Sequence, residues 1–157
     1  MRERHPVIGH VHLKVSDLER SVRFYTEAIG FEVMARWPGA AFLSFGGYHH
    51  HLGLNTWESL GGKPAPSTSP GLYHVAILYP TRGDLAAALR RLLAHRVPLA
   101  GAADHGVSEA LYLADPDGNG VELYWDRDPA LWPRDGDGRI AMRTDPLDLE
   151  SLLAEPV

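Results

Sequence analysis

The chain reads His10-Val-His-Leu-Lys-Val15 near its start and His74-Val-Ala-Ile77 near its middle. In both stretches a histidine opens an alternation that places apolar side chains on one side, as in a β-strand with one buried face. A capped helical pattern follows each stretch, at about 18–28 and at 81–95. This repetition predicts two similar units within one chain.

Further short strands complete each unit. The turn-rich segment 59–70 is interpreted as a linker, and Asp115-Pro-Asp-Gly-Asn-Gly120 as a hairpin turn. The expected strands after the first helix are 31–36, 40–45 and 50–56, and those of the second half are 72–78, 97–103, 109–114 and 121–125.

Both halves therefore follow the order βαβββ, as modules of about 7–58 and 71–127 with a tail at 128–157. A short helix is expected near the end of the tail, at 147–154. The predicted fold class is α+β. Two paired modules would form a single domain with a cupped, partly open mixed sheet around a metal cleft.

The amino-acid composition limits the classes of partner and of metal site that are possible. The 157 residues carry a net charge of −5, which argues against nucleic-acid and anionic-membrane partners. There is no cysteine, so disulfides and thiolate metal sites are excluded, but there are nine histidines. We find no secretory signal pattern and no membrane-spanning apolar run, so a cytoplasmic location is expected.

Strand alternation places potential metal ligands on the face opposite the apolar side chains. Glu122 and Tyr112 lie on the side away from their leucine and valine neighbours, and an inward-facing carboxylate is costly unless it is paired, protonated or bound to a cation. His10 and His74 occupy equivalent positions in the two halves. Two imidazoles and one carboxylate predict a divalent metal site, best suited to Fe(II), with Mn(II) or Zn(II) as alternatives.

The two halves differ at one ligand position. When the last strands are aligned, Gly53 in His51-Leu-Gly-Leu54 stands where Glu122 stands in Gly120-Val-Glu-Leu123. The first module would therefore donate no carboxylate, and the metal would have three protein ligands.

Three stretches resemble the glyoxalase/bleomycin-resistance/extradiol-dioxygenase (vicinal oxygen chelate) superfamily. These are residues 9–31, Leu72-Tyr-His-Val-Ala-Ile77 and Asp115-Pro-Asp-Gly-Asn-Gly-Val-Glu-Leu-Tyr124. The resemblance covers about residues 7–127. It implies the paired-module fold and a metal held by His10, His74 and Glu122.

Two further stretches are Tyr48-His-His-His-Leu-Gly-Leu-Asn-Thr-Trp57 and Asp104-His-Gly-Val-Ser-Glu-Ala-Leu-Tyr112. Through them the chain most resembles, within that superfamily, the type I extradiol catechol dioxygenases. The resemblance implies a catalytic Tyr112, ten residues before the ligand glutamate, and a substrate-binding His105. It implies His50 as the acid/base histidine, three residues before Gly53. Strand parity instead favours His51, so both stay open. These dioxygenases usually have four modules, whereas two are present here.

The resemblance implies a ring-cleaving dioxygenase that acts on a catechol-like aromatic diol with O2. Two alternatives stay open: another metal-dependent reaction such as glyoxalase-type isomerisation, lyase or transferase chemistry, or a resistance-type small-molecule binding protein without catalysis. A homodimer or higher homo-oligomer is expected, with modules paired or exchanged between chains.

Overall fold

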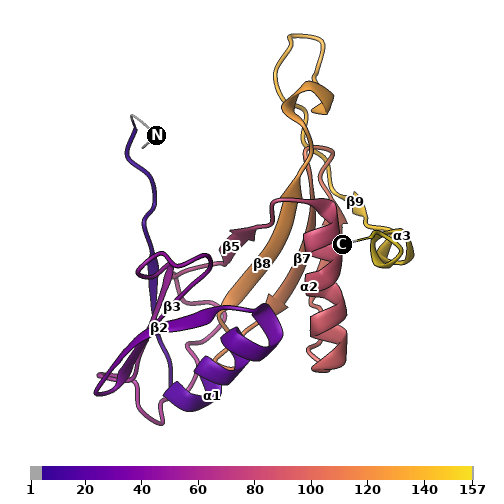
Figure 1. Cartoon of the computed structure of the whole chain (residues 1–157). Helices are drawn as coiled ribbons and strands as arrows, with labels where there is room; N and C mark the ends of the chain where they lie inside the picture. Colours follow the sequence, from indigo (N-terminus) through magenta and orange to yellow (C-terminus); the bar gives the residue numbers. More distant parts are fainter. Residues whose placement is uncertain (1–4, 157) are drawn as a thin grey trace. The chain divides into compact units, whose positions relative to one another are not determined.

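The structure is a computed structural model, and it describes residues 5–156. The chain forms two compact units, Met1–Ser67 and Thr68–Val157, which divide inside the predicted linker. Each unit is described by itself, and Figure 1 labels many of the helices and strands. Each unit combines helix with a mixed sheet, so the α+β prediction is confirmed.

The first unit has a four-stranded sheet in the order β1-β4-β3-β2. The strands β1 and β4 are parallel, and the other neighbouring pairs are antiparallel. Its elements are β1 (Val11–Lys14), α1 (Leu18–Arg23), the π-helix η1 (Phe24–Ile29), β2 (Glu32–Trp37), β3 (Ala40–Ser44) and β4 (Leu52–Asn55).

The predicted first helix is divided into an α and a π segment. Asp17 caps the start by accepting from the backbone N–H of Arg20, and Gly30 ends it with a left-handed φ of 101°. In the π segment the Gly30 N–H reaches back to the carbonyl of Tyr25, five residues earlier. These wider turns keep Tyr25 and Ile29 fully buried, and the apolar spacing of the sequence does not distinguish them from α turns.

The second unit has a five-stranded sheet in the order β5-β8-β7-β6-β9. Its first four strands repeat the arrangement of the first unit, because β5 and β8 are parallel and the other pairs are antiparallel. Its elements are β5 (Val75–Leu78), α2 (Arg82–Ala94), β6 (Gly101–Asp104), β7 (Ser108–Ala114), β8 (Gly120–Asp126), the 3-10 helix η2 (Pro129–Leu131), β9 (Asp145–Pro146) and α3 (Leu149–Leu153).

Several predicted strands are too long at their beginnings. The strand expected at 97–103 begins only at Gly101, because Arg96 takes a left-handed φ of 55° and Pro98 has no N–H to donate. The strands expected from His10 and from Leu72 begin at Val11 and Val75. Both candidate ligand histidines therefore lie immediately before a strand.

The apolar face of the last hairpin forms the core of the second unit, as predicted. Leu111, Leu113, Val121 and Leu123 are buried, and α2 packs on this side through a face that includes Leu85 and Leu89. Thr81 and Asp84 form the capping box that begins α2. The opposite face of the hairpin is left to Tyr112 and Glu122.

The tail belongs to the second unit. The strand β9 pairs with β6, and α3 packs against α2 with Leu152 fully buried (Figure 1). The short helix predicted at 147–154 is confirmed as α3. No helix within residues 5–156 combines the length and apolar character needed to cross a membrane.

Candidate metal centre

Glu122 lies at the centre of the polar face of the second sheet. It pairs with Tyr112 of β7 on one side and with Ala76 of β5 on the other. Its side chain is 13% exposed, so its carboxylate has lost most of its contact with water. A carboxylate in that setting needs a hydrogen-bond donor or a cation.

Gly120 allows the main chain before β5 to pass close to β8. A Cβ atom at this position would lie 2.1 Å from the carbonyl oxygen of Tyr73 and 3.0 Å from Cβ of His74. No side chain fits into that space, so Gly120 is what permits His74 to approach the strand that carries Glu122.

His74 and Glu122 are spaced as two ligands of one cation. The His74 Nε2 lies 2.9 Å from Oε2 of Glu122. Adjacent ligands at right angles, each about 2.1 Å from a metal ion, are separated by about 3 Å. The 33% exposed His74 side chain leaves the pair accessible. The two residues therefore fit a divalent metal that takes nitrogen and oxygen ligands.

A hydrogen-bonded chain continues from Glu122 to the tail. The Tyr112 hydroxyl lies 3.2 Å from Oε1 of Glu122 and 2.7 Å from Nε2 of His105. The other ring nitrogen of His105, Nδ1, lies 2.8 Å from the carbonyl oxygen of Arg143. Burial and the nearby charge of Glu122 raise the pKa of Tyr112 to about 12, so its hydroxyl keeps its proton near neutral pH.

The first unit places His50 beside His10. Their ring centroids lie 4.4 Å apart, and the His50 ring also contacts Phe42. Partial burial, followed by the charges of His10 and His49, lowers the pKa of His50. His51 is placed differently, because its Nδ1 lies 2.9 Å from Oγ of Ser44. Of the two candidate acid/base histidines, His50 is the one in ring contact with His10.

The correspondence between Gly53 and Glu122 is confirmed by the strand registers. Gly53 pairs with His12 across parallel strands, as Glu122 pairs with Ala76. A Cβ at Gly53 would lie 2.8 Å from Cγ of His12. The His12 ring thus occupies the space that the second unit gives to a carboxylate, and this face offers no carboxylate ligand at that position.

The candidate residues fall into two groups. The second unit brings together His74, Glu122, Tyr112 and His105, and the first unit brings together His10 and His50. Within residues 5–156 no group of three or more histidine, aspartate or glutamate side chains is assembled as a metal site. Because each unit is described by itself, the three-ligand set stays a prediction.

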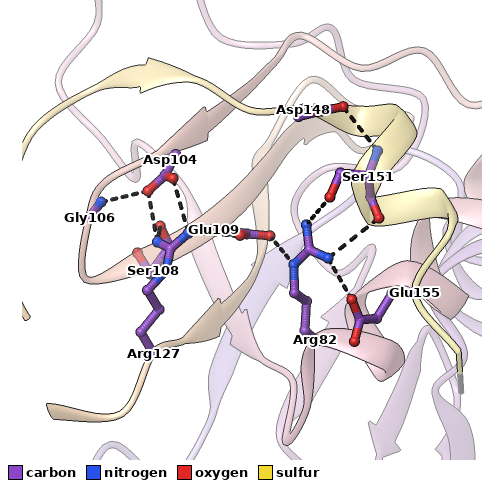
Figure 2. Close-up of polar contacts among 9 residues, drawn as sticks. All are labelled: Arg82, Asp104, Gly106, Ser108, Glu109, Arg127, Asp148, Ser151 and Glu155. Carbon is purple, nitrogen blue, oxygen red and sulfur yellow. Dashed lines mark hydrogen bonds and ion pairs between the residues drawn. The ribbon is translucent and has the colours of Figure 1, made fainter. Parts of the chain in front are cut away.

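A buried ion-pair network supports the end of the second sheet beside His105. Glu109 accepts from Nε of Arg82 and from Nη2 of Arg127, each at 2.8 Å (Figure 2). Arg127 also donates to both carboxylate oxygens of Asp104, which immediately precedes His105. Burial by itself would raise the pKa of Asp104. The hydrogen bonds from Arg127 and Gly106 and the positive charges of Arg127 and Arg143 outweigh the effect of burial, so the pKa of Asp104 is lowered.

Sequence reasoning missed the contributions of Gly120 and of Arg143. The main chain passes close to Gly120, and the Arg143 carbonyl faces His105. Both features depend on the path of the chain and not on the type of residue. The only available signal for Gly120 was its place next to a candidate ligand strand.

Comparisons with known proteins agree with these motifs. Residues 7–123 match the Glyoxalase/Bleomycin resistance protein/Dioxygenase superfamily. The chain is 45% identical over 148 residues to a catechol-2,3-dioxygenase of Bacillus subtilis, an alignment that covers 94% of this chain and 51% of that protein. It is 33% identical over 125 residues to biphenyl-2,3-diol 1,2-dioxygenase 3 of Rhodococcus globerulus, covering 77% of this chain and 64% of that protein.

The chain thus spans about half to two thirds of the length of these curated relatives. Among solved structures, a glyoxalase/dioxygenase from Nostoc punctiforme matches with a TM-score of 0.66 and 19% identity, covering 78% of this chain and 92% of that one. A glyoxylase/bleomycin resistance protein/dioxygenase domain from Frankia sp. EAN1pec matches with a TM-score of 0.65 and 25% identity, covering 78% of this chain and 99% of that one. The first likeness supports the fold alone.

Proposed function

This chain belongs to the Glyoxalase/Bleomycin resistance protein/Dioxygenase superfamily, and we propose that it is an extradiol dioxygenase that cleaves the ring of a catechol-like aromatic diol. The observation that carries the proposal is the pair formed by His74 and Glu122, together with the Tyr112 hydroxyl at the same carboxylate. The 45% identity to a catechol-2,3-dioxygenase supports the substrate class.

The proposed metal is Fe(II), with His10 as the third protein ligand. His74 and Glu122 would supply one nitrogen and one oxygen from the second unit, and His10 a nitrogen from the first. The chemistry supplied by bound Fe(II) is Lewis-acid activation of the diol and reaction with O2, for which three protein ligands leave positions open. Mn(II) and Zn(II) are the alternatives that the same donor set accepts.

The remaining residues would act on protons and hydrogen bonds. The Tyr112 hydroxyl would hydrogen-bond to a diol oxygen, and His105 would orient that hydroxyl and contact the substrate. His50, in contact with His10, would take up a proton from the diol and return it to the ring-opened product. His51, bonded to Ser44, would line the substrate side.

The main alternative is glyoxalase-type chemistry on the same fold. A fourth protein ligand from the first unit would stand at Gly53, and there the His12 ring fills the space of a Cβ atom. This observation favours a three-ligand site and therefore the dioxygenase. We also propose that the enzyme works in the cytoplasm as a homodimer or higher homo-oligomer.

The test begins with metal analysis of protein purified without oxygen. Fe(II)-loaded protein should consume O2 with a panel of catechols and form yellow ring-cleavage products. The Glu122→Gln variant should lose metal and activity, whereas the matched Glu58→Gln variant, at an exposed ion pair, should keep both. No product from any catechol would overturn the proposal, and metal-free protein that still binds aromatic ligands tightly would favour the resistance-type binder.

A further inference from the structure

We propose that the C-terminal strap, defined as residues 141–146, fixes the tautomer of His105 through the backbone carbonyl of Arg143. The strap would hold the hydrogen of His105 on Nδ1 and turn Nε2 toward Tyr112 as an acceptor. Arg143 is thereby a positioning residue that acts through its main chain. Only the consequence for catalysis rests on the proposed function; the tautomer does not.

The contact between the strap and His105 has two hydrogen bonds. The Arg143 N–H donates to the carbonyl oxygen of His105 over 3.1 Å, and Nδ1 of His105 lies 2.8 Å from the carbonyl oxygen of Arg143. A carbonyl oxygen can only accept, so Nδ1 must carry the hydrogen. The Thr144 hydroxyl lies farther from the same nitrogen, at 3.4 Å.

The strap is held in place on both sides of this contact. Before it, the Ala141 N–H donates to the carbonyl of Pro133. After it, β9 pairs with β6 at Ala103 and Asp104. The Arg143 carbonyl is therefore held at a fixed position beside the His105 ring, and the main chain determines how that ring is oriented.

The helix α3 anchors the far end of the strap. Arg82 donates to Glu155 and Ser151, as Figure 2 shows, and Arg90 donates to the carbonyls of Leu153 and Glu155. These bonds join the α3 segment to α2, so the tail cannot leave the sheet without breaking the Arg82–Glu155 ion pair and the Arg90 hydrogen bonds.

The tautomer decides the direction of the hydrogen bonds that reach Glu122. The Tyr112 hydroxyl has one hydrogen and two acceptors within reach. If Nε2 carried the hydrogen, His105 would donate to Tyr112, and Tyr112 would have to donate to the carboxylate. With the hydrogen on Nδ1, Nε2 of His105 is an acceptor like Oε1 of Glu122. The single Tyr112 hydrogen is then shared between acceptors at 2.7 Å and 3.2 Å, and a cation on Glu122 would turn it toward His105.

The test is ¹⁵N NMR of the full chain labelled at histidine, with no metal or substrate added and at an alkaline pH where imidazoles are neutral. The His105 signal is identified by its loss in His105→Gln. The expected shifts are those of a protonated Nδ1 and an unprotonated Nε2. The same pattern should persist in Tyr112→Phe and Thr144→Val, which remove the other two side-chain partners of the ring.

Two substitutions of Arg143 distinguish the contribution of its main chain from that of its side chain. Arg143→Ala loses the ion pair with Asp145 but keeps the backbone bonds, so the tautomer should stay unchanged. Arg143→Pro removes the N–H that donates to His105, and the hydrogen should shift toward Nε2, the form that imidazole prefers in water.

Wild-type protein with the hydrogen on Nε2 would overturn the inference, as would a switch in Tyr112→Phe. These readouts do not depend on turnover, so an inactive protein with the expected tautomer would count against the dioxygenase and not against the strap.

Discussion

At the scale of single residues, Gly120 controls the approach of His74 to Glu122. Gly120→Ala brings a methyl group to within 2.1 Å of the Tyr73 carbonyl oxygen, so the main chain at 73–74 must move. We expect metal affinity to fall by about tenfold or more, comparable with the loss of an outer contact of a metal site. Titration with Fe(II) or Zn(II) measures this.

The matched control is Gly71→Ala. A Cβ at Gly71 meets nothing within 4 Å, and its φ lies outside the left-handed region, so metal affinity should not change. Equal affinity in the Gly120 and Gly71 variants would mean that His74 does not bind the metal.

Tyr112 offers a second test at this scale. Tyr112→Phe removes the hydroxyl that lies beside both His105 and Glu122 but keeps the ring. A hydrogen bond to a charged group contributes about 1.5–3 kcal/mol, so we expect kcat with a catechol to fall by about tenfold to a hundredfold. Metal content should stay near that of wild type; a loss of metal instead would make Tyr112 a structural support of Glu122.

At the scale of elements, Glu109 joins α2 to the hairpin of β7 and β8. It is buried and accepts from Arg82 and Arg127. Glu109→Ala leaves two part-buried guanidinium groups without this partner, and loss of one member of a buried pair costs about 3–5 kcal/mol. Urea unfolding should show this loss, whereas Glu58→Ala at the exposed Lys14 pair should cost less than about 1 kcal/mol.

Asp104 gives the second unit an acid-sensitive contact. Its pKa in the folded chain lies below the ordinary value of 3.8, so the unfolded chain binds protons first as the pH falls. The stabilisation is present above that ordinary value and is lost as the pH drops through the folded value. Unfolding midpoints measured between neutral and acidic pH should fall less steeply for Asp104→Asn than for wild type.

The sequence predicted the elements whose spacing is determined by burial. Alternation in the last hairpin separated Leu111 and Leu123 from Glu122, and the capping residues located α2, because these patterns depend on neighbours in the chain. The π turns before Gly30 and the late start of β6 were missed, since both depend on local main-chain geometry. The pairing of β9 with β6 gave no residue pattern, because a two-residue strand is too short to show one.

The candidate site was predictable to a similar extent. The sequence located Glu122, Tyr112 and His74 through parity and repetition, and the structure brings them together. It did not reveal that Arg143 faces His105, because a backbone carbonyl is common to every residue type. His50 and His51 both stayed open, because which ring contacts His10 depends on the path of the loop before β4, and alternation alone does not determine that path.

At the scale of the whole molecule, the proposed ligand set draws on both units. Bound metal stabilises the folded chain by about 2.7 kcal/mol when its concentration is a hundred times the Kd, so added Fe(II) or Zn(II) should raise the melting temperature. His10→Ala and His74→Ala should each abolish this increase, although they alter different units. His95→Ala, at the exposed end of α2, is the control and should keep it.

An increase in melting temperature on adding metal that persists in His10→Ala would contradict the proposed ligand set. It would assign the metal to the second unit alone.

The His12 ring above Gly53 has a consequence for how this protein could change over generations. A glutamate introduced at Gly53 collides with imidazole atoms at 2.8 Å, and a smaller residue at His12 leaves an unfilled gap. Each substitution by itself costs packing free energy, so a carboxylate at this position of the first unit needs both changes together. The two halves can in this way stay unequal at this position although their strands share one pairing pattern.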